Sequence, residues 1–167
     1  TFAFDYYELK IHIGNVTKKE IMDEINQNII EFTVDIKDTK LYESNIRTCL
    51  GVRKWIKNNS LDAFTVNFMD VDSKNGLSSV PFYEASKQMA AGNGYAGEGD
   101  VMTSALVSAL QKQGCETSFT EIFCPDWAED ALQALPGRAS RGRGYKPLST
   151  SGHGQLQCDN GPRLYRS

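Results

Sequence analysis

Two carboxylates, those of Glu98 and Asp100, follow a glycine-rich stretch and come directly before a segment with helical spacing. The stretch 92–97 (Gly-Asn-Gly-Tyr-Ala-Gly) fits the pattern G-x-G-x-x-G, which binds dinucleotides when the glycines follow a strand. Here the preceding residues, 84–91, have a helical pattern, and the two carboxylates would repel a pyrophosphate. A loop that brings carboxylates to a helix start suits a metal ion or a polyol better. Alternatively, both are ordinary acidic residues at a helix N-terminus, and spacing alone favours this alternative.

A third carboxylate, that of Glu121, lies in the segment 118–123, which is expected to form a strand. Because α/β proteins bind ligands at the carboxyl ends of their strands, a glutamate near a strand end is a candidate ligand. The alternative is a solvent-facing strand residue, which is the better interpretation for a glutamate considered alone.

The other residues capable of such chemistry have less support. His12 alternates with apolar neighbours and is expected to pack rather than to bind a ligand. His153 lies in a stretch rich in Gly and Ser without acidic partners nearby. Asp126 and the pair 129–130 are expected to be surface charges.

Hydrophobic periodicity predicts the elements that must position these residues. An α/β fold with a mainly parallel sheet flanked by helices is expected, because strand and helix patterns alternate along the chain. Thr17 is a suitable cap for a helix through Ile21, Ile25 and Ile29. The other expected helices are 41–57, 82–91 and 101–112, and the expected strands are 9–13, 32–36, 63–69 and 118–123.

Composition limits the classes of function. The chain has 167 residues, enough for one domain, and its net charge of −3 argues against a general nucleic-acid binder. No apolar run approaches the roughly 20 residues that cross a bilayer. The four cysteines form no C-x-x-C pair, so we expect reduced cytosolic thiols and a cytoplasmic protein. The opening at Thr1, without an initiator Met or a signal peptide, suggests a piece of a longer protein.

Four short segments, in this order and spacing, resemble the L-arabinose isomerase family. They are Ala-Phe-Thr at 63–65, Gly-Tyr-Ala-Gly-Glu-Gly-Asp at 94–100, Thr-Ser-Ala-Leu at 103–106 and Thr-Ser-Phe-Thr-Glu at 117–121. The resemblance extends from about Tyr7 to Asp126. One departure is Val-Met at 101–102, where the familiar enzymes have Trp-Lys, so L-arabinose, an L-fucose-type sugar and another aldose all remain open.

The resemblance implies a function and a site. Glu98 and Glu121 would bind a divalent metal, Mn²⁺ or a similar cation, and would be the catalytic residues of an aldose–ketose isomerase. The family's two histidine ligands come later and have no counterpart in this sequence, so the chain alone is expected to be inactive. A small-molecule sugar substrate and, at full length, a homo-oligomer are implied as well. The alternatives are a non-catalytic α/β sugar-binding module and, less favoured, a flavodoxin-like nucleotide domain.

The last 32 residues differ from the rest of the chain, so residues 1–135 are expected to form the core and 136–167 a basic tail. The tail holds six basic residues and one acidic residue, with many Gly and Ser. One interpretation is a poorly structured or disordered tail, because such a composition buries little apolar surface. The other is a shifted reading frame, because one possible encoding of residues 139–144, read one base later, gives His-Leu-Gly-Glu-Gly. The family has a similar histidine-bearing segment near this place.

Overall fold

The computed structural model describes residues 5–126, 131–137, 149–150 and 156–157, without positions 33, 73, 75 and 116, and describes side chains as far as Phe119. The helices are α1 (Tyr6–Gly14), α2 (Lys18–Glu31), α3 (Thr39–Asn58), the 3₁₀ helix η1 (Phe68–Asp70), α4 (Phe82–Ala90) and α5 (Val101–Lys112). The strands are β1 (Ala63–Thr65), β2 (Gly94–Ala96), β3 (Phe119–Asp126), β4 (Ala131–Gly137), β5 (Ser149–Thr150) and β6 (Leu156–Gln157).

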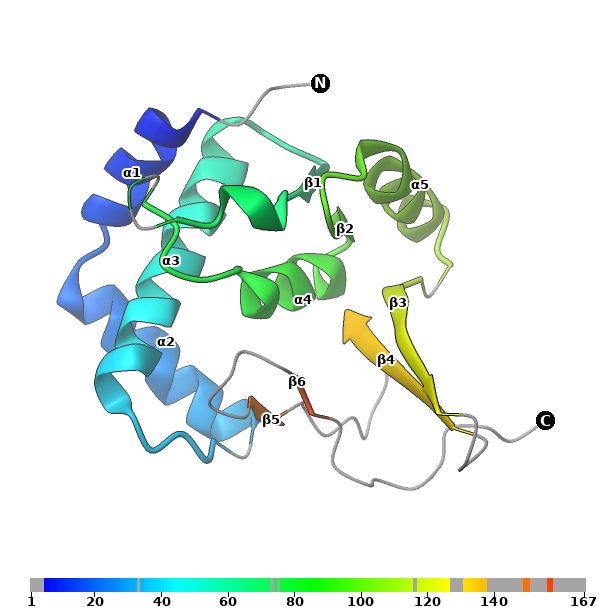
Figure 1. The fold of residues 1–167 in the computed structure, drawn as a ribbon. Coiled ribbons are helices and arrows are strands. Elements are labelled where there is room, and N and C mark those ends of the chain that lie inside the picture. Colours follow the sequence, from blue (N-terminus) through cyan, green and yellow to red (C-terminus); the bar gives the residue numbers. More distant parts are fainter. Residues whose placement is uncertain are drawn as a thin grey trace.

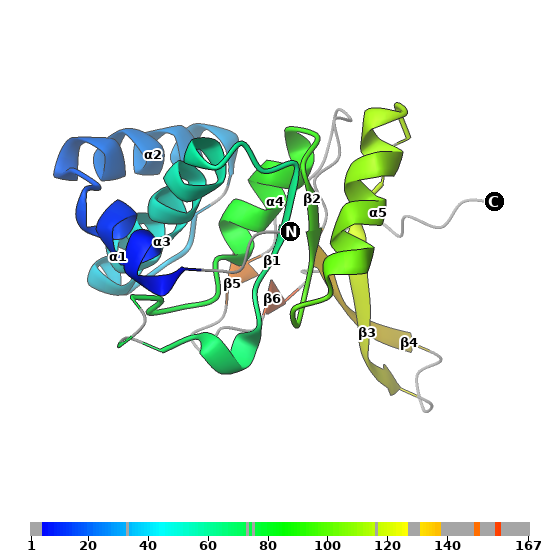
Figure 2. The ribbon, with the colours of Figure 1, turned by 90° about the horizontal axis from the view of Figure 1, so that it is seen from above.

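A parallel pair of strands stands between two layers of helices. β1 pairs with β2 in parallel, with Phe64 opposite Tyr95 and Thr65 opposite Ala96. The helices α3 and α4 lie on one side of this pair and α5 lies on the other, while α1 and α2 pack outside α3 (Figures 1 and 2). The predicted α/β class is therefore confirmed. β3 and β4 form a separate antiparallel pair, in which Glu121 is opposite Leu135.

The long helices begin and end where their sequences predict. Thr17 caps α2 through a capping box: its hydroxyl accepts a hydrogen bond from the backbone N–H of Glu20, and the Glu20 carboxylate accepts one from the Thr17 N–H at 2.8 Å. Ile21, Ile25 and Ile29 were predicted to share the inward face of this helix. Ile21 is buried but Ile29 is 60% exposed, so only the first half of that face is covered. No described helix combines the length and apolar character that a membrane crossing requires.

The core lies between α3 and the sheet. Val52, Trp55 and Ile56 of α3 contact Phe64 of β1 and Tyr95 of β2, and all five are at most 4% exposed. Burial of such side chains contributes about 1.5–3 kcal/mol each. The strands that carry the candidate site are thus fixed by their own buried residues.

Three of the predicted strands need correction. Residues 9–13 form part of α1, because Asp5 caps a helix there by accepting hydrogen bonds from the N–H groups of Tyr7 and Glu8. The spacing of Leu9 and Ile13 fits one helical face as well as one strand face. Within 32–36, the described residues form no strand. The strand predicted over 63–69 ends at Thr65, because the Asn67 carboxamide caps η1 by accepting from the Met69 N–H at 3.1 Å.

An ionic cluster around the buried Glu84 joins α2, α3 and α4. Arg53 donates to both carboxylate oxygens of Glu84 and to both of Glu24, at distances between 2.8 and 3.0 Å. Glu84 is fully buried, and Glu24 also accepts from the Lys87 ammonium at 2.8 Å. The hydrogen bond from Arg53, above all, lowers the pKa of Glu24 to about 2. These charges fix the three helices on one side of the sheet.

Candidate functional site

Glu98 occupies a tight turn between β2 and α5. The turn is closed by a hydrogen bond from the Asp100 N–H to the Gly97 carbonyl at 3.0 Å. Its two central residues have positive φ angles, +54° for Glu98 and +83° for Gly99. This is the combination found in type I′ turns, in which Gly, Asn and Asp prevail.

The backbone of Glu98 is unfavourable for a side chain of its kind. A residue with a Cβ in the left-handed region costs roughly 1–2 kcal/mol, and such outliers gather at functional sites. The Glu98 side chain is exposed, and among the described residues its carboxylate has no hydrogen bond or ion pair that would explain the conformation. An acidic group is thus held in a strained position with its oxygens available to a ligand.

Asp100, by contrast, is a helix cap. Its carboxylate accepts hydrogen bonds from the Thr103 N–H at 2.9 Å and from the Thr103 hydroxyl at 2.5 Å. These bonds lower the pKa of the exposed Asp100 carboxyl. The helix-terminus interpretation is therefore correct for Asp100. It does not account for Glu98, which lies two residues before the cap, because the field of a helix terminus acts mainly within its first turn.

The glycine-rich motif serves packing here. The helix α4 precedes it, as predicted, and Gly92, with φ +96°, follows the end of that helix. Gly94 begins β2 where α5 approaches closely: a Cβ there would lie 2.0 Å from the Ser104 carbonyl oxygen and 2.7 Å from the Ser108 nitrogen. The missing side chain lets α5, and with it the Glu98 turn, lie directly against the sheet.

Replacing Gly94 by Ala should therefore destabilise the chain by several kcal/mol, because both clashes are with backbone atoms that cannot swing away. Gly14→Ala is the matched control, since a Cβ at that position meets nothing within 4 Å. Urea unfolding of both variants measures the difference. Equal stabilities for the two variants would contradict the close packing of α5 on β2.

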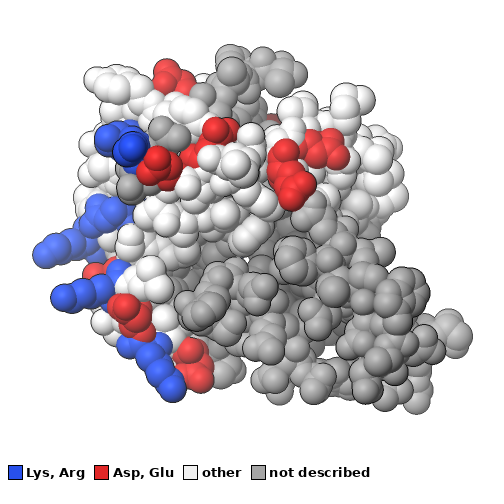
Figure 3. Space-filling view, in the orientation of Figure 1, with Lys and Arg blue, Asp and Glu red and all other residues white. Residues whose placement is uncertain are grey.

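The carboxyl end of β1 and β2 carries a polar, acidic surface. A hollow of about 530 Å³ runs along β1 and reaches this end at Thr65, Asn67 and Val101, although Glu98 itself does not line it. Burial, and then a hydrogen bond with Asp70, raises the pKa of Tyr6, at the wall of this hollow, to about 12. In Figure 3, basic side chains gather on the side of α1 and α2, whereas the region of β1 and α5 shows acidic side chains only. This end would favour a cation or a polar ligand.

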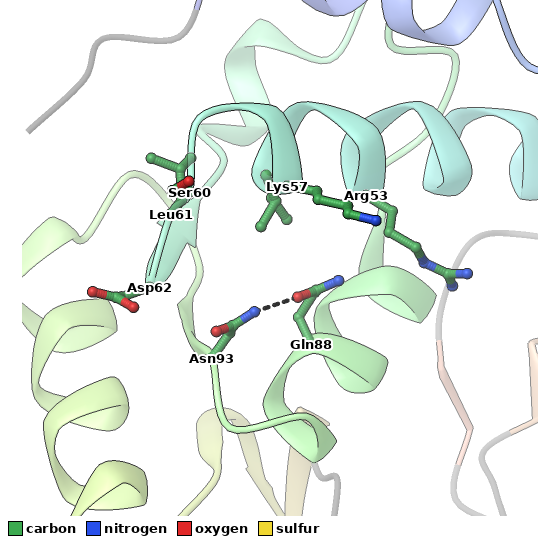
Figure 4. A pocket seen from close by; sticks show the side chains of 8 residues that line it. Arg53, Lys57, Ser60, Leu61, Asp62, Gln88 and Asn93 are labelled. Atoms are coloured by element: carbon green, nitrogen blue, oxygen red, sulfur yellow. Dashed lines mark hydrogen bonds between the residues drawn. The ribbon is translucent and has the colours of Figure 1, made fainter.

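A second hollow, of about 460 Å³, lies at the amino ends of the same strands. Figure 4 shows it beside the last turns of α3, with Gln88 and Asn93 pointing toward one another and joined by a 2.5 Å hydrogen bond. Parallel sheets bind ligands at the carboxyl ends of their strands, so we place the candidate site at the Glu98 end.

The other residues singled out from the sequence have different places. Glu121 was expected near the end of a strand, but it is third from the start of β3, which pairs antiparallel with β4 and is separate from the β1–β2 pair. Its side chain is outside the described residues. His12 is half-buried in α1 with its Nε2 3.4 Å from a Glu8 carboxylate oxygen, so it contacts its own helix. The side chains of Asp126, 129–130 and His153 fall outside the described part of the chain. Within that part, no three His, Cys, Asp or Glu residues come close enough to hold a metal ion.

The two cysteines with described side chains are free thiols. Cys49 is buried in α3, and burial raises its pKa to about 12, whereas Cys115 is exposed. Neither contributes to the Glu98 end of the sheet.

Comparison with known proteins identifies one family. The family model described as the L-arabinose isomerase central domain matches residues 3–116. An L-arabinose isomerase of Leuconostoc mesenteroides is 34% identical over 106 residues, which are 60% of this chain and 22% of that protein. L-arabinose isomerase 1 of Bacillus licheniformis is 36% identical over 120 residues, 70% of this chain and 24% of that protein. L-arabinose isomerase 2 of Clostridium acetobutylicum is 30% identical over 147 residues, which are 80% of this chain and 29% of that protein. The chain thus spans roughly a quarter of the length of these relatives.

Proposed function

Because this chain belongs to the L-arabinose isomerase central-domain family, we propose that it is the central part of an aldose–ketose isomerase acting on a pentose or deoxyhexose such as L-arabinose. The observation that carries the proposal is Glu98: it lies in the matched region, at the carboxyl end of a parallel sheet, in a backbone conformation that its side chain disfavours. The homologues are themselves named L-arabinose isomerases, and this supports the same reaction class.

We propose that Glu98 and Glu121 hold a divalent cation, Mn²⁺ or a similar ion. Carboxylate oxygens are the ligands that such hard cations take, and the exposed Glu98 carboxylate is available for one. The described residues offer only this part of a ligand set, so the remaining ligands would come from Glu121 and from segments beyond the described part. When bound, the cation would stabilise negative charge on the sugar oxygens at C1 and C2.

The reaction moves a carbonyl group from C1 to C2, so a hydrogen must pass from C2 to C1, as a proton or a hydride, and the hydroxyl proton on O2 must be transferred to O1. In the proton route, one of the two carboxylates accepts the proton from C2 and returns it to C1. The turn contributes by holding Glu98 in one conformation before the sugar binds, so that no backbone ordering is required during the reaction. Asp100 keeps the turn attached to α5 and takes no direct part.

The alternative function is a sugar-binding module without catalysis, and one experiment separates the two. The intact enzyme that carries this chain should convert L-arabinose to its ketose with Mn²⁺ present, and should lose this activity in EDTA. Sugar binding without ketose formation would favour the module. The chain of residues 1–167 alone should show no turnover, because it spans only about a quarter of its relatives; ketose formation by the purified chain would contradict this.

Oligomeric assembly of the intact enzyme is also proposed, on the family resemblance alone. Sedimentation of the intact protein tests it, and a monomer at working concentration would rule it out.

A further inference from the structure

The side chain of Thr65 contacts the Glu98 turn from the neighbouring strand. Its hydroxyl accepts a hydrogen bond from the Gly99 N–H at 3.1 Å and donates one to the Gly97 carbonyl at 3.3 Å. Its two partners are the residues directly before and directly after Glu98. One hydroxyl group therefore ties both ends of the peptide segment that carries the candidate ligand.

We infer that Thr65 is the positioning residue for Glu98, acting through these two hydrogen bonds; the inference rests on the proposed function. Both neighbours of Glu98 are glycines, which allow many backbone conformations, so the local sequence does not by itself select the strained one. The Thr65 hydroxyl selects it by satisfying one donor and one acceptor of the turn at once.

Thr65 is itself firmly placed. It is the last residue of β1, opposite Ala96 in the parallel pair, and Ala96 is fully buried. The preceding pair, Phe64 and Tyr95, is also buried, with ring centroids 5.1 Å apart. Because these contacts hold β1 against β2, the hydroxyl cannot move away from the turn without disturbing the core.

The alternative role for Thr65 is a β-branched residue that fits a strand, in which the methyl group matters and the hydroxyl does not. Two substitutions separate these roles. Thr65→Val keeps the branched shape and removes both hydrogen bonds, whereas Thr65→Ser keeps the hydroxyl and removes the methyl group. Groups that orient a metal-binding residue typically change metal affinity or activity by about 10–100-fold when removed.

The first readout needs neither metal nor sugar. Hydrogen exchange of the Gly99 amide in the metal-free protein should accelerate at least about tenfold in Thr65→Val, because the amide loses its acceptor, and should stay near the wild-type rate in Thr65→Ser. Unchanged exchange in Thr65→Val would overturn the inference, as would equal acceleration in both variants.

The second readout uses the intact enzyme with L-arabinose and Mn²⁺. Thr65→Val should lower kcat/KM by about 10–100-fold and weaken Mn²⁺ binding, while Thr65→Ser should stay within about threefold of the wild type. In a Glu98→Gln background, Thr65→Val should not lower kcat/KM any further, because Thr65 acts through Glu98. Additive losses in the double variant, or full activity in Thr65→Val, would overturn the inference. Full activity in Glu98→Gln would instead refute the proposed site, whatever the exchange of Gly99 shows.

Discussion

Replacing Glu98 by Gln in the intact enzyme should lower kcat/KM for L-arabinose by about three orders of magnitude. The change removes the charge but keeps the size of the side chain, so it removes the proposed metal ligand and proton acceptor together. Contributions of several kcal/mol are typical of such groups, and about 4 kcal/mol corresponds to this loss. Steady-state kinetics at saturating Mn²⁺ measures it.

The matched control is Asp100→Asn, two residues further along the chain. Asn is as good a helix cap as Asp, so this variant should keep its activity and most of its stability. If Glu98→Gln kept the wild-type kcat, Glu98 would be only a charge near a helix terminus. The variant Glu98→Gly should be inactive but more stable by about 1 kcal/mol, because glycine adopts a positive φ without strain.

The second large effect is expected in the ionic cluster around Glu84. Arg53→Met should destabilise the chain by about 3–5 kcal/mol at pH 7, because it leaves the fully buried Glu84 and the neighbouring Glu24 without their main partner. The control is the adjacent Lys54→Met. Arg53 and Lys54 are both about a third exposed, but the partner of Lys54, Glu20 at 2.8 Å, is 40% exposed, whereas Glu84 is fully buried. Pairs with an exposed carboxylate contribute only about 0–1 kcal/mol. Equal losses in the two variants would contradict the account of the cluster.

The same cluster predicts a pH dependence. The pKa of Glu24 is lowered from 4.5 to about 2 in the folded chain, so its stabilising contribution is complete above pH 4.5 and is lost as the pH falls toward 2. A shift of this size corresponds to roughly 3 kcal/mol. At pH 3, which is still above the folded pKa, about 2 kcal/mol of this contribution should be lost. Urea unfolding at pH 7 and pH 3 should show that loss in the wild type and a smaller one in Arg53→Met. A loss of the same size in both proteins would assign the acid sensitivity to other carboxyl groups.

The helices from α2 to α5 were the part of the fold that the sequence predicted well. The bounds of α5 agree with the predicted range 101–112, because Asp100 caps its start and its apolar positions are regularly spaced. The sequence was misread at residues 9–13, where Leu9 and Ile13 satisfy both a strand pattern and a helix pattern. The Asp5 cap decides between the two in favour of the helix.

The pair of glutamates proposed as the site rests only on the family resemblance. Spacing could not separate Glu98 from Asp100, and the difference lies in the backbone: one residue is in a strained turn and the other is a cap. The role of Thr65 was missed, because its partners lie 32 and 34 residues away and depend on the register of β1 with β2.

The central claim, that Glu98 and Glu121 share one divalent cation, is tested most directly by locating that cation. Crystals of the intact enzyme grown with Mn²⁺ should show an anomalous scattering peak at the manganese absorption edge, with carboxylate oxygens of both glutamates about 2.0–2.6 Å from it. The peak should vanish in Glu98→Gln crystals grown under the same conditions. A Mn²⁺ peak bound elsewhere would contradict the account. Two carboxylates more than roughly 10 Å apart would contradict it as well, because metal–oxygen bonds of this length cannot bridge that span.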